Sequence, residues 1–333
     1  MLPERLDRQP LTAAVVETGR LVYNDREYFY QNYPHLVSLY IANGMPESDT
    51  MANYLSQIKI FLEYCDAIKI DALDLREADI NNWVRKLREN NYSPSSVAGK
   101  IHALKAFYKA AKALQVIEKN PMQEISGHSF NSHLGVLNSF NKDQIQAIIQ
   151  TFNSKKEEIR LRNTLFVLFM GIEGLRTVEV HKISLEDIDY IKKIIVVNSK
   201  GGVGKRQIIY PSMTTFDYIF KYLKAISTEP IRDDLGTPLL LTDDHKCQGK
   251  RISRRGIRVV IDKALEEVDL KFKGISCHTL RHSCATNLYD STKDLRLVQD
   301  QLRHANPATT ARYAHVLDKL QERPTENLVP NLL

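Results

Sequence analysis

Residues 278–286 read HTLRHSCAT and residues 301–315 read QLRHANPATTARYAH, so His278, Arg281, His304 and Tyr313 lie within thirty-six residues. An arginine offers a planar fork of donors to phosphoryl oxygens, and an imidazole can donate or accept a proton near neutral pH. A tyrosine hydroxyl becomes a nucleophile once it is deprotonated. This combination of side chains predicts the attack of a tyrosine on a phosphodiester.

The segments around these motifs predict helices and one small sheet. Residues 187–210 contain two β-branched runs separated by a glycine-rich loop, which predicts two antiparallel strands. Helical periodicity recurs in residues 141–152, 159–171, 178–183, 214–223, 254–268, 278–289, 295–302 and 307–313. We therefore expect a domain over residues 138–333 that is mainly α-helical, with a small antiparallel β-sheet and a C-terminal tail.

The N-terminal part predicts a separate helical domain. Apolar residues recur at helical steps through residues 29–121, and Ser48 or Asp49, Asp79 and Ser93 stand where helix N-caps are expected. This periodicity predicts a bundle of four or five helices. Residues 1–28 lack sustained periodicity and are expected to form an extension. Residues 122–137, rich in Gly, Ser, His and Asn, predict an interdomain linker.

Composition sets the broad class of protein. The chain has 333 residues, of which 43% are hydrophobic and 26% charged, and such a length favours two globular domains. The net charge of +6 is compatible with a polyanionic partner. The four cysteines have no C-x-x-C spacing, and no apolar run resembles a signal peptide or a membrane span. We expect a cytoplasmic protein that has no membrane segment and no metal site.

The loop at residues 199–205, SKGGVGK, invites comparison with a nucleotide-binding phosphate loop. Such a loop needs Ser or Thr after its lysine and a helix that begins at the phosphates. Here Arg206 follows Lys205, and the next residues predict a strand. A loop that places Lys200 or Lys205 on a nucleic-acid phosphate is therefore the preferred interpretation.

A further arginine completes a recognisable pattern. Arg176 lies in GLRTVE, residues 174–179, about a hundred residues before His278. With Lys200 and the two C-terminal motifs, the chain resembles the tyrosine recombinases, the phage integrase and Xer-type family, over residues 29 to about 320. The resemblance implies a two-domain DNA clamp, with a helical core-binding domain followed by a catalytic domain.

The resemblance also implies a mechanism. Tyr313 attacks a DNA phosphate and becomes joined to the 3′ end, while Arg176 and Arg281 hold the non-bridging oxygens. A second 5′ hydroxyl then attacks the phosphotyrosine, so strands are exchanged between two sites without ATP, a metal or another cofactor. The partners implied are double-stranded DNA recombination sites and three further copies of the chain, in a homo-tetramer.

Three proton-carrying side chains complete the implied set. Lys200 is the expected general acid for the departing 5′ oxygen, with Lys205 as the competing candidate. His278 is the expected proton acceptor for Tyr313, and His304 the expected hydrogen-bond donor to the phosphate. The tyrosine needs this help because only roughly one in a thousand such groups is ionised at neutral pH.

Four neighbouring residues are expected to support this set. Glu179 is expected to orient Arg176 or His278, and His282 and His315 are expected to make structural hydrogen bonds. Arg303 departs from the family pattern, because the residue before the motif histidine is usually glycine. Either the turn tolerates a side chain there, or Arg303 adds a phosphate contact.

Basic residues outside the motifs predict further DNA contacts. They lie on a helix of the first domain, beside the glycine-rich loop, and before the H-x-x-R motif. They are Lys100 and Lys105, Lys205 and Arg206, and Arg251, Arg254, Arg255 and Arg258. The tail after Tyr313 carries scattered apolar residues and resembles the family's exchanged C-terminal segment, which docks on a neighbouring protomer.

Two other functions use related features. A type IB topoisomerase relaxes DNA with similar chemistry, and a regulator could keep the fold without cleaving. The complete set of six motif residues favours a recombinase over a regulator, and the HTLRH motif resembles integrases more than topoisomerases. Chromosome dimer resolution, phage or plasmid integration and transposition all remain open as the biological role.

Overall fold

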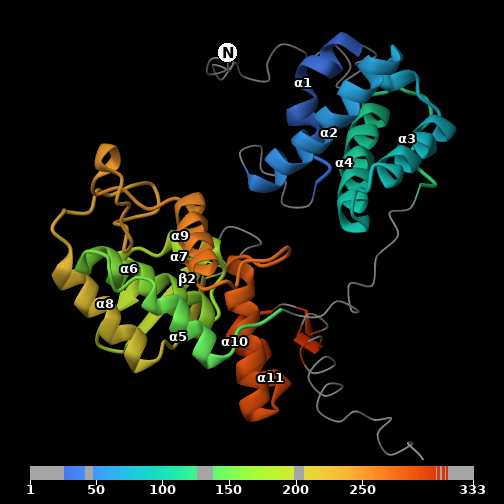
Figure 1. Ribbon diagram of the computed structural model, residues 1–333. Coiled ribbons are helices and arrows are strands. Elements are labelled where there is room, and N and C mark those ends of the chain that lie inside the picture. The colour runs from blue at the N-terminus through green and yellow to red at the C-terminus, as the bar shows by residue number, and fades with distance from the viewer. Residues whose placement is uncertain are drawn as a thin grey trace, which may run out of the picture. The chain divides into compact units, whose positions relative to one another are not determined.

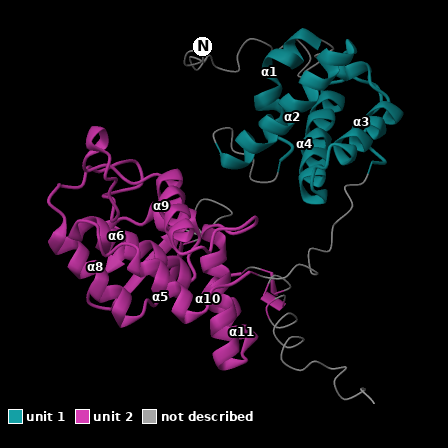
Figure 2. Cartoon of the chain, viewed as in Figure 1, with its two compact units in different colours: residues 1–132 teal, residues 133–333 magenta. Residues whose placement is uncertain are grey.

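The computed structural model of the chain describes residues 26–41, 48–125, 138–198, 206–304, 306–307, 310–311 and 313. The chain divides into two compact units, Met1–Ser132 and His133–Leu333, each with its own hydrophobic core (Figure 2). The fold class predicted from the sequence is confirmed, since the described residues are mostly helical and include one small antiparallel sheet.

The described residues of the first unit form four α-helices and one short 3-10 turn (Figure 1). Ser48 and Ser93 cap their helices as expected, because their hydroxyls accept the backbone N–H groups of Met51 and Ser96, each at 3.2 Å. Asp79 instead lies at the third helical position. The elements are α1 (Arg26–Ser38), α2 (Asp49–Ile68), η2 (Ala72–Asp74), α3 (Glu77–Glu89) and α4 (Pro94–Ala113).

Aromatic side chains fill the core of this unit. Phe61 meets Trp83 edge to face at 5.0 Å between ring centroids, and Phe107 meets Tyr108 in the same manner at 5.3 Å. Residues 122–125 differ from the predicted linker, because Met122 and Ile125 are buried in the same core. Burial of these two apolar side chains stabilises the packed conformation, although the surrounding Gly, Ser, His and Asn residues favour a loop. The rest of the predicted linker, residues 126–137, lies outside the described residues.

The second unit combines a small sheet, which packs against α7 and η5, with a larger set of helices (Figure 1). The helical elements are α5 (Lys142–Gln150), α6 (Glu157–Val167), η4 (Leu168–Ile172), α7 (Thr177–Lys182), η5 (Leu185–Asp187), α8 (Met213–Ala225), η6 (His245–Cys247), α9 (Arg254–Glu267), α10 (Cys277–Thr292) and α11 (Leu295–Leu302). The described part of each unit contains no helix long and apolar enough to cross a bilayer.

The sheet has three strands where two were expected. β1 (Ile188–Asp189) pairs with β2 (Ile194–Asn198), which pairs with β3 (Arg206–Ile209), and both pairings are antiparallel. Ile195 is opposite both Ile188 and Ile209, and all three are buried. β1 has only two residues, so it exists through its pairing rather than through its own sequence pattern.

Two packed segments carry the residues of interest. Helix α6 continues into η4, which packs against α10. This packing brings residues 173–176 next to α10 and α11. Ser283 on α10 accepts the backbone N–H of Phe140 at 2.7 Å, and Asn287 donates to the Phe140 carbonyl at 3.1 Å. Two hydrogen bonds thereby anchor α10 to Phe140, and α11 follows it after a short turn.

Candidate active site

The turn at Gly174 brings distant parts of the second unit together. Its φ is +68°, and a Cβ there would approach a Leu302 methyl to 2.8 Å and the Cys284 sulfur to 3.1 Å. Only glycine suits both this backbone conformation and this space. The Gly174 carbonyl accepts hydrogen bonds from Arg281 and, at 3.3 Å, from Arg303. The turn therefore connects α7, α10 and the end of α11.

Arg176 lies at the N-cap of α7 and is held by Glu179. The Arg176 guanidinium donates to Glu179 Oε1 at 2.8 Å, and the Arg176 backbone N–H donates to Oε2 at the same distance. The Glu179 side chain is fully buried, whereas 23% of the Arg176 side chain is exposed. Glu179 orients Arg176, which is one of the two alternatives expected from the sequence. Arg176 keeps part of its donor fork open to solvent.

Arg281 projects from α10 into the same place. Its guanidinium donates to the Gly174 carbonyl and, at 2.5 Å, to the Leu302 carbonyl. It also lies 3.8 Å from Glu179 Oε2. Burial first, and then the Arg176 charge, lower the pKa of Arg281 from its ordinary value. The group stays protonated at neutral pH because a guanidinium starts so high.

Arg303 is the third arginine on this carboxylate. It ends α11 in the left-handed conformation, with φ +55°, so the turn does tolerate a side chain. Its guanidinium donates to Glu179 Oε2 at 3.0 Å and to the Gln301 carbonyl at 2.8 Å. We refer to Arg176, Arg281, Arg303 and Glu179 as the arginine cluster.

Tyr313 is buried beside α10, with only 3% of its surface exposed. Its hydroxyl forms a 2.7 Å hydrogen bond with His282 Nδ1. His282, expected to have a structural role, thus contacts the predicted nucleophile directly. His278 lies one turn earlier on the same helix and is exposed. The only signal for His282 in the sequence was its position next to Arg281.

His304 follows Arg303 and is half-buried. Its Nδ1 hydrogen-bonds with the Thr310 hydroxyl at 2.9 Å. Burial, and then the charges of Arg281 and Arg176, lower the pKa of His304 to about 4. His304 is therefore neutral at physiological pH. If the Thr310 hydroxyl donates to Nδ1, the ring proton is on Nε2, where it can be given to a substrate oxygen.

The described residues thus bring together four of the six predicted catalytic side chains. Arg176 and Arg281 share Glu179, His304 senses both arginine charges, and Arg281 and Tyr313 interact electrostatically. His278 is on the helix that carries Arg281. Lys200, like its competitor Lys205, lies outside the described residues.

Two of the predicted DNA contacts are contradicted by burial. Lys100 is 3% exposed, donates to Gln57 Oε1 at 2.5 Å and lies 4.9 Å from the centre of the Tyr92 ring. Burial lowers the pKa of Lys100. The Arg251 side chain is 5% exposed and pairs with Asp233 at 2.6 Å. Sequence patterns show a basic residue but not the acceptors that fold around it, so both were misplaced on the surface.

Five other basic residues remain at least partly accessible. Arg255 and Arg258 on α9 are exposed, and Arg254 is half-buried at the start of that helix. Lys105 is half-buried on α4. Arg206 is exposed at the start of β3 and pairs with Asp187 at 3.1 Å. These five residues remain candidates for DNA contact.

The cysteines near the site are buried thiols. Burial raises the pKa of Cys277 to about 11 and that of Cys284 to about 12, and the Cys284 thiol donates to the Ile172 carbonyl at 3.0 Å. Among the described residues, no group of three His, Cys, Asp or Glu side chains is arranged to hold a metal ion.

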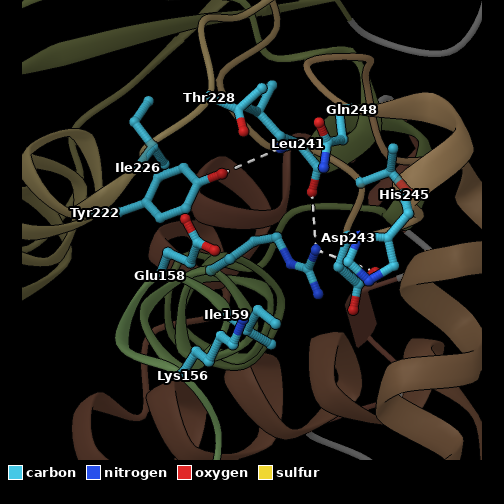
Figure 3. A pocket seen from close by; sticks show the side chains of 12 residues that line it. Lys156, Glu158, Ile159, Tyr222, Ile226, Thr228, Leu241, Asp243, His245 and Gln248 are labelled. Atoms are coloured by element: carbon cyan, nitrogen blue, oxygen red, sulfur yellow. Dashed lines mark hydrogen bonds and ion pairs between the residues drawn. The ribbon is translucent and has the colours of Figure 1, made fainter.

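A pocket of about 320 Å³ lies elsewhere in the second unit (Figure 3). The buried Arg162 on its wall donates to the Leu241 carbonyl at 2.9 Å and lies 3.4 Å from Asp243. The Tyr222 hydroxyl accepts the Leu241 backbone N–H at 3.1 Å. None of the described members of the predicted catalytic set lines this pocket, so it does not contribute to the candidate active site.

Guanidinium groups, the neutral imidazole of His304 and a tyrosine lie around one turn, an arrangement suited to binding a phosphodiester. Comparisons with known proteins identify its family. Residues 138–319 match the model of the phage integrase family, and residues 40–115 match that of the phage integrase N-terminal SAM-like domain. The chain belongs to the phage integrase family, whose members include the tyrosine recombinases, enzymes of site-specific DNA recombination.

Individual relatives agree with this assignment. Tyrosine recombinase XerD of Staphylococcus saprophyticus is 28% identical over 271 residues, which cover 81% of this chain and 88% of that protein. Tyrosine recombinase XerC of Listeria welshimeri is 29% identical over 238 residues, or 72% and 77% of the two chains.

Solved structures share the fold. The XerH site-specific recombinase bound to a palindromic difH substrate matches with a TM-score of 0.68 and 18% identity, over 84% of this chain and 80% of that chain. A lambda integrase dimer bound to a COC′ core site matches with a TM-score of 0.62 and 15% identity, over 85% and 96% of the two chains.

Proposed function

We propose that this chain is a site-specific DNA recombinase that cleaves and rejoins DNA through a 3′-phosphotyrosine on Tyr313. The observation that carries the proposal is the arginine cluster next to Tyr313 and His304, where three guanidinium groups face one carboxylate. The excess positive charge suits a phosphodiester, whose non-bridging oxygens gain negative charge as the tyrosine attacks.

Arg176 and Arg281 bind the non-bridging oxygens in this mechanism. Arg176 is partly exposed and so can offer donors to DNA, while Arg281 is anchored to two backbone carbonyls and offers a charge at a fixed position. Neutral His304 adds one hydrogen bond to the same phosphate. A site that is already positive and ordered stabilises the transition state without reorganising.

Proton transfer from Tyr313 has two candidate acceptors. His278 is the residue that the family resemblance implies, while His282 makes the 2.7 Å hydrogen bond in the DNA-free chain. We propose that His282 holds the tyrosine before cleavage and that His278 accepts its proton on DNA. His282→Ala should then leave the acid limb of the cleavage-rate profile in place, whereas His278→Ala should remove it.

Lys200 is proposed as the general acid that protonates the departing 5′ oxygen. A 5′-bridging phosphorothiolate has a leaving group that needs no proton, so it tests this role directly. Cleavage by Lys200→Ala should be restored on that substrate, and cleavage by Lys205→Ala should not need restoring. The reverse pattern would assign the role to Lys205.

The proposed assembly is a homo-tetramer on two double-stranded DNA sites, acting in the cytoplasm. Each unit supplies a DNA-binding surface, with residues 29–121 as the core-binding domain and residues 138–333 as the catalytic domain. The XerH and lambda integrase structures, both of which are bound to DNA, support this partner. Truncation after Leu320 should prevent synaptic complexes if the tail docks on a neighbouring protomer. Normal assembly by the truncated chain would refute that docking.

Trapping the covalent complex tests the central proposal. The protein is incubated with genomic fragments, denatured, and the DNA that stays attached is sequenced. Wild-type protein should retain a narrow set of sequences, and Tyr313→Phe should retain none. Joining of two copies of a recovered site would establish recombination, whereas relaxation of any supercoiled plasmid without joining would favour a type IB topoisomerase.

A further inference from the structure

Arg303 stands where the family pattern has glycine, and its backbone still adopts the conformation that glycine favours. The Arg303 N–H donates to the Asp300 carbonyl and the His304 N–H to the Gln299 carbonyl, each at 3.1 Å, which closes α11. The left-handed conformation disfavours a side chain. Lys69 and Lys293 end α2 and α10 in the same conformation but are exposed, so the position of the Arg303 side chain is what sets it apart.

The side chain turns inward rather than to solvent, and only 5% of it is exposed. The guanidinium donates to Gln301 O at 2.8 Å, to Glu179 Oε2 at 3.0 Å and to Gly174 O at 3.3 Å. These three acceptors belong to the end of α11, to α7 and to the turn before α7. Arg303 therefore ties together the segments that carry Arg176 and His304.

The contacts of Arg303 change the net charge that the arginine cluster can offer to a ligand. Without Arg303, the buried Glu179 carboxylate would cancel one of the two positive charges of Arg176 and Arg281. With Arg303, the carboxylate has a cation of its own, and both remaining charges are available to a phosphate. The Nε of Arg303 is also buried and has no hydrogen-bond partner among the described residues. Such an unmatched cluster is costly until an anion arrives.

We propose that Arg303 is a positioning residue of the active site, which neutralises Glu179 and so leaves Arg176 and Arg281 free to hold the scissile phosphate. This inference rests on the proposed function. Arg303 acts through Glu179 and the Gly174 turn rather than by touching DNA, which decides between the two roles that the sequence left open for it.

The test compares the single-turnover cleavage rates of four variants. The DNA substrate has a nick next to the cleavage site, so that religation is prevented and the covalent complex accumulates. Arg303→Gln removes the charge, and Arg303→Gly removes the side chain while relaxing the backbone. Arg303→Lys restores the charge, and Arg296→Gln removes an exposed arginine from the same helix as a matched control. Circular dichroism confirms that each variant is folded.

We expect the Gln and Gly variants to cleave about tenfold more slowly, less than the hundred- to thousandfold cost of losing a donor that touches the charge. The Lys variant should regain most of the rate, and Arg296→Gln should match wild type. The Arg303 charge lowers the pKa of Glu179, because it favours the ionised carboxylate. On acidification, cleavage by the Gln variant should therefore be lost at a higher pH than cleavage by wild type. A merely structural role of Arg303 would leave this pH dependence unchanged.

A second measurement separates this inference from the proposed function. Inorganic phosphate is titrated into the DNA-free proteins and followed by the ring signals of His304. Arg303→Gln should bind it about tenfold more weakly, with Arg303→Lys close to wild type. Wild-type affinity in the Gln and Gly variants, or a Lys variant no better than Gln, overturns the inference even if no DNA is cleaved. Absence of a covalent adduct in wild type, by contrast, overturns the proposed function alone.

Discussion

Two buried arginine centres of the second unit differ in how their charge is matched. Arg251 pairs with Asp233 alone, and its remaining hydrogen bonds go to the Ser184 hydroxyl and to three backbone carbonyls. In the arginine cluster, three guanidinium groups share Glu179. A centre that holds the fold together has its charge balanced within the protein, whereas the cluster has positive charge left over for a ligand.

The largest expected effect is the loss of Arg281. Arg281→Gln should reduce single-turnover cleavage by about a hundred- to a thousandfold, because it removes a fixed charge that stabilises the transition state. Gel analysis of the covalent adduct measures this loss. Arg281→Lys, which keeps the charge but not the fork, should fall between wild type and Gln. A Gln variant with wild-type cleavage would remove the distinction between the two centres.

Loss of Arg251 should act on stability instead. Arg251→Gln should lower the free energy of unfolding by about 2–3 kcal/mol, less than for a fully buried pair because Asp233 is partly exposed. Urea denaturation measures this change. The cleavage rate of the folded fraction should stay within about twofold of wild type. A selective loss of cleavage without destabilisation would place Arg251 in the active site.

Acidification should lower the stability of the fold through His304, whose pKa the arginine cluster helps to lower. Its folded pKa, about 4, lies below the ordinary value of 6.5, so the unfolded chain binds more protons between those values. Stability should therefore decline as pH falls from about 6.5 toward 4, by on the order of 1–2 kcal/mol for this half-buried group. Urea denaturation at several pH values shows the decline. His304→Gln, which does not titrate, should flatten it, and an equally steep profile would contradict the assignment.

The smallest effect extends the comparison to the first unit. Lys100, like Arg251, is buried with its own partners, so Lys100→Met should leave the salt dependence of DNA binding unchanged. Arg255→Gln with Arg258→Gln should instead reduce the slope of log affinity against log salt by about two. Fluorescence anisotropy across salt concentrations compares the variants. A reduced slope for Lys100→Met would return this lysine to the DNA-binding surface.

Local signals allowed much of the fold to be predicted. Helices expected at 254–268 and 295–302 are observed at Arg254–Glu267 and Leu295–Leu302, because Ser253 and Asp294 cap them with their own side chains. The two-residue strand β1 was not expected as a separate strand, since only its pairing with β2 defines it. A short strand of this kind has no periodicity to detect.

Sequence motifs predicted members of the candidate site, whereas contacts that depend on the fold could not be predicted. Arg176, Arg281, His304 and Tyr313 were predicted from their order and flanking residues, and the structure places them close together. The inward turn of Arg303, the contact of His282 with Tyr313 and the burial of Lys100 depend on acceptors from distant parts of the chain. Lys200 remains a prediction from the sequence, because it lies outside the described residues.

The burial of three of the four cysteine thiols has a practical consequence for spectroscopy. Cys65, Cys277 and Cys284 are buried and their thiols have raised pKa values, whereas Cys247 is partly exposed. A maleimide dye added briefly at neutral pH will therefore attach at Cys247, without any cysteine being replaced. The native chain thus already carries a single labelling position on its second unit, from which fluorescence can test whether DNA binds.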